Sequence, residues 1–143
     1  MGLKYFTTVA LVCAAVAARA GVVSGTLYME ARGEGERGLR AVASVIYNRA
    51  KGSAAQMEKF CLKPYQFSCW NGKAPESVRI APKSAFDRRV YALCLSIEKE
   101  LLSGNFKPLG EWTHYYNPRL CSPKWAQGVP YVKIGNHNFL KAK

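Results

Sequence analysis

Two long segments of this chain place apolar residues at helical spacing, and they constrain the fold more than any other feature. In Glu36–Lys51 the apolar positions recur every three or four residues, and Gly52 supplies a stop signal. The same period returns in Lys83–Leu102, which Gly104 closes. A shorter pattern over residues 22–32 predicts a third helix that glycines terminate. The sequence therefore predicts a mainly helical body.

The chain changes character after the last of these helices. Trp112–Asn117 and Tyr131–Phe139 carry the aromatic and β-branched residues that are typical of short strands, with prolines and a glycine between them. Residues 53–80 contain two prolines and a group of aromatic residues, and we expect this segment to be irregular. The pattern favours an α+β fold with a small β element near the C-terminus.

The first twenty residues resemble an export signal. Lys4 precedes an apolar run that ends near Ala18, and Ala18-Arg-Ala20 provides small residues before Gly21. The run is too short for a comfortable membrane span, which needs about 20 apolar residues. We expect residues 1–20 to be a cleaved signal peptide, with an uncleaved tether or a releasable membrane anchor as alternatives. Residues 21–143 then form a single domain, exported to the periplasm or the extracellular cell wall.

The chain is strongly basic, with 21 Lys and Arg against 9 Asp and Glu. Removing Lys4 and Arg19 leaves 21 − 2 = 19 basic residues and a net charge of 19 − 9 = +10. Such a charge indicates a polyanionic partner. Export favours the anionic cell envelope, and the basic residues are spread along the chain, so no nucleic acid is expected. We also expect a monomer, with transient membrane contact through the N-terminal segment.

The number of cysteines does not decide whether disulfides form or how the cysteines pair. Cys13 lies in the expected signal, and the rest of the chain holds Cys61, Cys69, Cys94 and Cys121. An even number in an exported domain predicts up to two disulfides, with three possible pairings, and four buried thiols are the alternative. A zinc site is disfavoured because no Cys-x-x-Cys pair is present and His114 and His137 lie far apart in the chain. We expect neither a metal nor a cofactor.

Glu30 is a candidate for acid–base chemistry. It follows three large apolar residues near the end of the short predicted helix, where a carboxylate can point from a rigid element into a cleft. Cleavage of a glycosidic bond needs a carboxylic acid to protonate the leaving oxygen. The same position also suits a solvated or ion-paired glutamate, so position alone does not decide between the two. Glu34 lies on the same helix face as Glu30 only if the helix continues through Gly33.

Four blocks of the chain extend this hypothesis to nearly the whole sequence. They are Leu27–Arg49, which contains Tyr-Met-Glu-Ala-Arg-Gly-Glu-Gly, then Gln66–Asn71, Thr113–Pro118 and Ile134–Phe139. In this order they resemble the signature segments of the cell-wall hydrolase family that includes the spore-cortex-lytic enzymes. The resemblance implies a lysozyme-like body and a catalytic role for Glu30. It also implies that peptidoglycan glycan strands are the substrate.

The implied reaction is lytic transglycosylation of the bond between N-acetylmuramic acid and N-acetylglucosamine, which yields a 1,6-anhydro sugar. One carboxylate suffices for it, whereas a hydrolase needs a second at about 5–5.5 Å or 6.5–9.5 Å. The candidates for a second carboxylate are Glu34, Glu36, Asp87 and Glu111. A hydrolytic muramidase and a non-catalytic wall-binding protein remain the alternatives. Wall remodelling, spore germination and phage lysis, as an endolysin, are all compatible biological roles.

The other blocks offer side chains that suit sugars. Aromatic faces stack on pyranose rings, and amides and hydroxyls bond their substituents. The expected substrate-binding residues are Gln66, Phe67, Ser68, Trp70, Tyr115, Tyr116 and Asn117. About half of the aromatic residues are expected to belong to the core instead. His114 and His137 are expected to be hydrogen-bonded structural residues.

Overall fold

The computed structural model describes residues 21–75, 78 and 80–142, and the expected signal at residues 1–20 lies outside them. A helical segment over residues 21–31 comes first. The other elements are α2 (Gly35–Arg49), α3 (Ala54–Leu62), a 3-10 turn (Ser68–Trp70), α4 (Ala85–Ser103), β1 (His114–Tyr116), a 3-10 turn (Lys124–Ala126), β2 (Tyr131–Ile134) and β3 (His137–Leu140). This order confirms the expected α+β fold.

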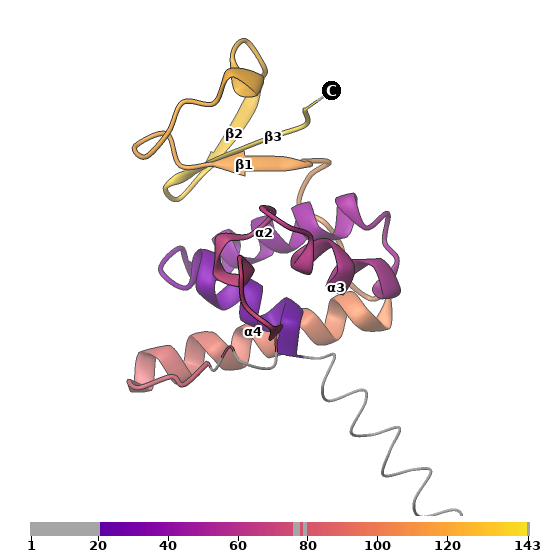
Figure 1. Ribbon diagram of the computed structural model, residues 1–143, viewed down its shortest axis with the longest axis vertical. Helices are drawn as coiled ribbons and strands as arrows, with labels where there is room; N and C mark the ends of the chain where they lie inside the picture. Colours follow the sequence, from indigo (N-terminus) through magenta and orange to yellow (C-terminus); the bar gives the residue numbers. More distant parts are fainter. Residues whose placement is uncertain (1–20, 76–77, 79, 143) are drawn as a thin grey trace, which may run out of the picture.

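Helix α2 is the central element of the body. It contacts α3, α4, β1 and β2. Its apolar residues are buried along almost the whole middle of the helix, from Leu39 to Ile46, with only Arg40 partly exposed. In Figure 1 the sheet lies above α2, and α4 runs along the opposite side of the body. Contacts on several sides explain why consecutive residues in the middle of α2 are buried.

The helical segment 21–31 runs through the interior. Residues 22–28 are all buried, and Figure 1 shows the segment between α2 and α4. Val23 and Leu27 are fully buried in the core. The last turn of this segment emerges at the surface and carries Glu30, so the packing of the buried turns fixes where that carboxylate lies. Among the described residues, no helix is both long and apolar enough to cross a membrane.

Helix α4 begins and ends at the signals that the sequence provides. Ser84 and Asp87 form a reciprocal capping box at its start. Gly104 ends the helix in the left-handed conformation, with φ 79°. Ile97 and Leu101 are fully buried and face the core.

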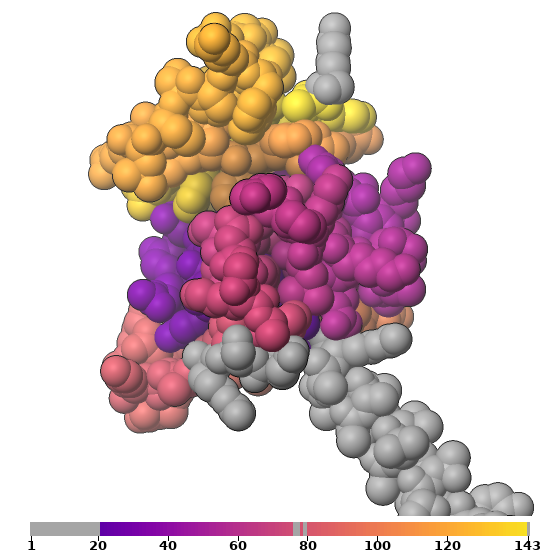
Figure 2. Space-filling view, viewed as in Figure 1, coloured from indigo at the N-terminus to yellow at the C-terminus, as the bar shows by residue number. Residues whose placement is uncertain are grey.

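A three-stranded antiparallel sheet covers one side of the body, with strand order β1-β3-β2. Central strand β3 places Phe139 opposite both Tyr115 of β1 and Val132 of β2. Phe139 is fully buried, and the rings of Trp112 and Tyr115 pack against it. Figure 2 shows the C-terminal residues, in orange and yellow, as a cap on the helical body.

Helix α3 corrects the expectation that residues 53–80 are irregular. Its nine residues bury Met57, Phe60 and Cys61, which contact the body along one face. These positions do have helical spacing, but the pattern covers only about two turns and prolines follow it. A helix this short is marginal in isolation, and it is stabilised here by packing against α2 and α4.

The four described cysteines correct the disulfide expectation. All four are free: Cys61, Cys69 and Cys94 are buried thiols, whereas Cys121 is exposed in the loop after β1. Burial raises the pKa of Cys61 and of Cys94 to about 12. In the described part of the chain, no group of three or more His, Cys, Asp or Glu side chains could hold a metal ion.

Candidate active site

Glu30 lies where the helical body meets the sheet. It is half-buried in the last turn of the segment 21–31. The hydroxyl of Tyr115, on β1, donates a hydrogen bond of 2.7 Å to its Oε2. A residue from the start of the chain and one from its C-terminal sheet therefore form a single unit. The structure thus brings together two of the residues that the sequence selected.

Tyr115 is held rigidly and stays protonated. Its ring stacks on Phe139 at 5.4 Å and contacts the ring of His137 edge-on at 5.2 Å. Burial, followed by the charge of Glu30, raises the pKa of Tyr115 well above its usual value. Tyr115 is therefore a fixed donor that orients the Glu30 carboxylate. Because this hydrogen bond occupies Oε2, the proton for a substrate would be carried by Oε1.

The segment after α3 packs beneath the catalytic candidate. Trp70 Nε1 donates to Thr26 Oγ1 at 2.8 Å, and that hydroxyl donates to the Val22 carbonyl one turn earlier, also at 2.8 Å. Burial and the charge of Glu30 raise the pKa of the Cys69 thiol to about 11. Cys69 and Thr26 thus support the Glu30 turn. Sequence reasoning did not select either of them, since nothing in the sequence shows which small side chains lie under the site.

The predicted block Gln66–Trp70 divides into buried and accessible residues. Phe67 and Trp70 are core residues, only 3% and 7% exposed, and Phe67 packs edge-on against Phe60 at 5.6 Å. Ser68 is exposed and Gln66 is half-buried. The two polar side chains are therefore accessible to a ligand, whereas the two aromatic rings pack inward.

Tyr116 and Asn117 continue β1 beyond Tyr115. The Tyr116 hydroxyl accepts a hydrogen bond of 3.2 Å from Asn138 Nδ2. Asn117 Oδ1 accepts one of 3.0 Å from the backbone of Arg119, so it also shapes the following turn. Tyr116 meets the ring of Trp125 edge-on at 5.9 Å, and Trp125 is 46% exposed. Trp125 lies between the recognised sequence blocks, which is why sequence reasoning missed it.

Glu34 is bound to the turn between β2 and β3. Its carboxylate accepts hydrogen bonds from the backbone N–H and the side-chain amide of Asn136, at 2.9 and 3.0 Å. Burial alone would raise its pKa, but these hydrogen bonds and nearby His137 lower the pKa below the usual value. Gly135 allows this contact, because a Cβ there would lie 2.0 Å from Glu34 Oε2. Glu34 therefore ties the start of α2 to the β2–β3 turn.

His114 and Arg49 form a second contact between body and sheet. Arg49 Nη1 lies 3.0 Å from His114 Nε2, and Arg49 Nη2 donates to Gln66 Oε1 at 3.5 Å. Burial and the positive charge of Arg49 lower the pKa of His114. Since a guanidinium can only donate, Nε2 accepts, and the Nδ1 proton points to Thr113 Oγ1 at 2.9 Å. Arg49 ends the first sequence block, yet sequence reasoning did not select it.

Comparisons with known proteins agree with this geometry. A family model described as cell wall hydrolase matches residues 33–140, starting just after Glu30. Among solved structures, the catalytic domain of the germination-specific lytic transglycosylase SleB from Bacillus anthracis has a TM-score of 0.60 and 26% identity, covering 87% of this chain and 94% of that one. The catalytic domain of the Bacillus cereus SleB protein has a TM-score of 0.59 and 26% identity, covering 87% and 90%.

No curated protein sequence matches the chain. The family match nevertheless spans well over half of the chain, and it includes three of the four sequence blocks completely. The two structural matches extend over most of this chain and nearly all of the SleB domains. The resemblance seen in the sequence is therefore confirmed, and the chain belongs to the cell wall hydrolase family.

Proposed function

We propose that this chain is a peptidoglycan-degrading lytic transglycosylase that cleaves the bond between N-acetylmuramic acid and N-acetylglucosamine, with Glu30 as its catalytic residue. The observation that carries the proposal is the Glu30–Tyr115 pair at the junction of body and sheet. A half-buried carboxylate held in one orientation by a rigid donor suits acid–base catalysis. The similar SleB domain from Bacillus anthracis is itself a lytic transglycosylase by name.

Glu30 acts first as an acid and then as a base. The protonated carboxyl gives its proton to the glycosidic oxygen while the bond from that oxygen to muramic C1 breaks. Positive charge then develops at C1, and the new carboxylate stabilises it. The carboxylate next takes the proton of the muramic C6 hydroxyl as that oxygen bonds to C1. The product is a 1,6-anhydro sugar, no water is consumed, and Glu30 is protonated again.

The other candidate carboxylates are engaged elsewhere, which favours this reaction over hydrolysis. Glu34 holds Asn136, and Asp87 accepts from Ser84 at the start of α4. Glu36 pairs with Arg40 at 2.9 Å, and Glu111 pairs with Lys141 at 3.0 Å. A hydrolase needs a second carboxylate to act as nucleophile or to activate water. A transglycosylase needs neither a second carboxylate nor a water molecule, because the substrate's own hydroxyl attacks C1.

Sugar contacts are assigned to the accessible members of the predicted set. Gln66, Ser68, Tyr116 and Asn117 provide amides, hydroxyls and one aromatic face around the sheet–body junction, and Trp125 adds an exposed ring. Tyr115 acts through Glu30. Phe67 and Trp70 act from beneath, by holding the backbone of their loop in place.

The family implies an exported or cell wall location. We propose more specifically that cleavage after Ala20 releases residues 21–143 as a monomeric domain into the periplasm or the extracellular wall. Edman sequencing of the exported chain is expected to begin at Gly21. Recovery of a membrane-bound chain that retains Met1 would instead support the anchor.

Replacing Glu30 by Gln tests the catalytic assignment. The amide cannot transfer a proton, so we expect turnover of purified peptidoglycan to fall by about a thousandfold. The matched control is Glu36→Gln, which removes an exposed carboxylate of α2 and should keep full activity. Full activity in Glu30→Gln would reject the assignment, and a wild-type chain that binds walls without turnover would support the wall-binding alternative.

The products separate the two enzymatic alternatives. Mass spectrometry of the digest should find anhydro-muropeptides, which are lighter by one water than the reducing-end products of a muramidase. A digest made up of reducing-end products would replace the proposed reaction with hydrolysis and would leave the catalytic role of Glu30 intact.

A further inference from the structure

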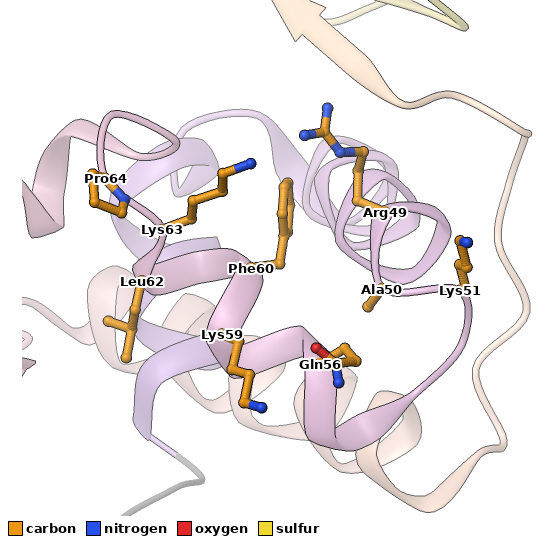
Figure 3. A pocket seen from close by; sticks show the side chains of 9 residues that line it. All are labelled: Arg49, Ala50, Lys51, Gln56, Lys59, Phe60, Leu62, Lys63 and Pro64. Carbon is orange, nitrogen blue, oxygen red and sulfur yellow. The ribbon is translucent and has the colours of Figure 1, made fainter.

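A basic pocket of about 720 Å³ opens between the end of α2 and helix α3 (Figure 3). Four cationic side chains line this basic pocket: Arg49, Lys51, Lys59 and Lys63. No acidic side chain lines it. Four positive charges therefore surround one concave site.

The cations of the basic pocket lack carboxylate partners among the described residues. The ion pairs found among the described residues are formed by Arg40, His137 and Lys141, which do not line the basic pocket. Half-buried Arg49 contacts neutral groups: an imidazole, an amide oxygen and the ring of Phe60, whose centroid is 5.0 Å from the guanidinium carbon. A partly desolvated guanidinium is stabilised by a matching anion. The basic pocket is thus suited to an anionic ligand.

The floor of the basic pocket is apolar, which narrows the class of ligand. Phe60 and Leu62 also line the basic pocket. Figure 3 shows the Phe60 ring standing between Lys63 and Arg49. A ligand that fits must place alkyl groups on these surfaces and carboxylates near the cations. A peptide with small apolar side chains and free carboxylates meets both requirements, whereas a polyphosphate chain leaves the apolar floor uncovered.

Arg49 joins the basic pocket to the proposed glycan site. Its guanidinium contacts both the pocket wall and Gln66, which is assigned to sugar contact. A glycan strand at Gln66 would therefore carry its side branches close to the basic pocket. We propose that the basic pocket binds the carboxylate-bearing peptide stem of peptidoglycan, an inference that rests on the proposed function. The enzyme would then select strands by their stems as well as by their sugars.

Turnover with two substrates tests this inference. The Lys59→Gln/Lys63→Gln double variant removes two exposed charges from the basic pocket, and Lys99→Gln/Lys107→Gln removes two exposed charges elsewhere. On peptidoglycan that retains its stems, we expect the pocket variant to lose about fivefold in kcat/KM through a higher KM. On glycan strands stripped of stems by an amidase, it should match the control. An equal loss on both substrates, or no loss on either, would overturn the proposal.

Direct binding distinguishes failure of the basic pocket from failure of the proposed function. Soluble stem peptide without sugar is titrated into the full chain while the His114 imidazole is followed by NMR. A bound carboxylate offsets the charge of Arg49, so the pKa of His114 should rise, less so at high salt and not in the pocket variant. No response to the peptide, or an equal response to glycerol phosphate oligomer, overturns the peptide assignment. A response to the stem peptide in a chain that shows no turnover would refute the proposed function and leave the binding of the peptide intact.

Discussion

At the residue scale, the orientation of the Glu30 carboxylate depends on Tyr115. The two residues are 85 positions apart in the sequence and are joined by a hydrogen bond of 2.7 Å. Hydrogen bonds to a carboxylate are stronger than those between neutral groups. Together with the rigid stacking of Tyr115 on Phe139, this bond fixes the rotamer of Glu30. The proposed catalytic unit is therefore a pair of residues.

Removing the Tyr115 hydroxyl should impair catalysis more than folding. Phenylalanine keeps the ring packed on Phe139 but leaves the Glu30 carboxylate without its donor. We expect kcat to fall by about 10- to 100-fold with KM nearly unchanged, because a misoriented acid slows proton transfer. Steady-state kinetics on solubilised glycan strands gives this split between kcat and KM.

Tyr47→Phe is the matched control, since that tyrosine packs on Phe106 in the body and has no contact with Glu30 in the structure. Urea unfolding should place both variants within about 1 kcal/mol of the wild type. If Tyr115→Phe instead lost several kcal/mol of stability and kept its kcat, the tyrosine would have a packing role only.

At the scale of elements, α4 positions the helical segment that carries Glu30. Glu98 of α4 is only 2% exposed, and its Oε1 accepts a hydrogen bond of 3.0 Å from the Ser24 backbone N–H. Burial raises the pKa of Glu98 to about 7, although hydrogen bonds from Ser24 and Val23 act in the opposite direction. The segment is thus held at one end by α4 and carries Glu30 at the other.

This carboxyl predicts a pH-dependent stability. Between its ordinary pKa of about 4.5 and its folded pKa of about 7, the folded chain binds more protons at Glu98 than the unfolded chain. The contribution of Glu98 to the free energy of unfolding is therefore fully present below about pH 4.5. This contribution, about 3 kcal/mol, is lost as the pH rises through 7. Urea unfolding at a series of pH values measures this loss.

Glu98→Gln should flatten that dependence while keeping an acceptor for Ser24. The groups whose charges influence Glu98 or respond to it are Glu58, Cys61 and Cys94. A control Glu58→Gln variant should retain most of the slope. An unchanged slope in Glu98→Gln would assign the pH dependence to another group.

The turn between β2 and β3 is held to the body by Glu34. Gly135 has a φ of 57°, and a Cβ there would lie 2.0 Å from Glu34 Oε2. Gly135→Ala is therefore expected to cost about 3 kcal/mol, of which roughly 1–2 kcal/mol reflects the left-handed backbone. Thermal unfolding should show the lower stability.

Gly128→Ala is the control for backbone strain, because Gly128 also has a positive φ, 71°, but no atom within 4 Å of its Cβ position. It should cost about 1–2 kcal/mol alone. In a Glu34→Ala background the additional cost of Gly135→Ala should largely disappear. Equal costs for the two glycine variants in the wild-type background would refute the tie between Glu34 and the turn.

At the scale of the whole molecule, folding decides which thiols can react. Cys61, Cys69 and Cys94 are buried, with their pKa values raised by burial, whereas Cys121 is exposed. Alkylation of the folded chain from residue 21 at pH 8 should therefore add one label rapidly. Unfolding without reductant should expose three further thiols, counted by mass spectrometry.

Cys121→Ser removes the rapid label and serves as the control for its assignment. Fewer than four labels after unfolding without reductant would show that disulfides form in the exported protein.

The sequence by itself determined the helical body, the C-terminal β element and the choice of Glu30. Long helices such as α2 and α4 can be predicted because their large apolar residues recur at helical spacing over several turns. Glu30 and Tyr115 were both selected, because each belongs to a block that resembles the cell-wall hydrolases. Short α3 was not predicted, since two turns of pattern are weak evidence without the surfaces that bury them.

Only the tertiary structure decided the roles of the selected residues. Phe67 and Trp70 share a sequence block with Gln66 and Ser68, yet the aromatic pair packs inward and the polar pair is accessible. In the sequence, Glu34 is a candidate for a second carboxylate of the site. In the structure, both of its oxygens accept hydrogen bonds from the β2–β3 turn. These outcomes depend on contacts between segments far apart in the chain, and local spacing carries no information about which distant groups will satisfy a side chain.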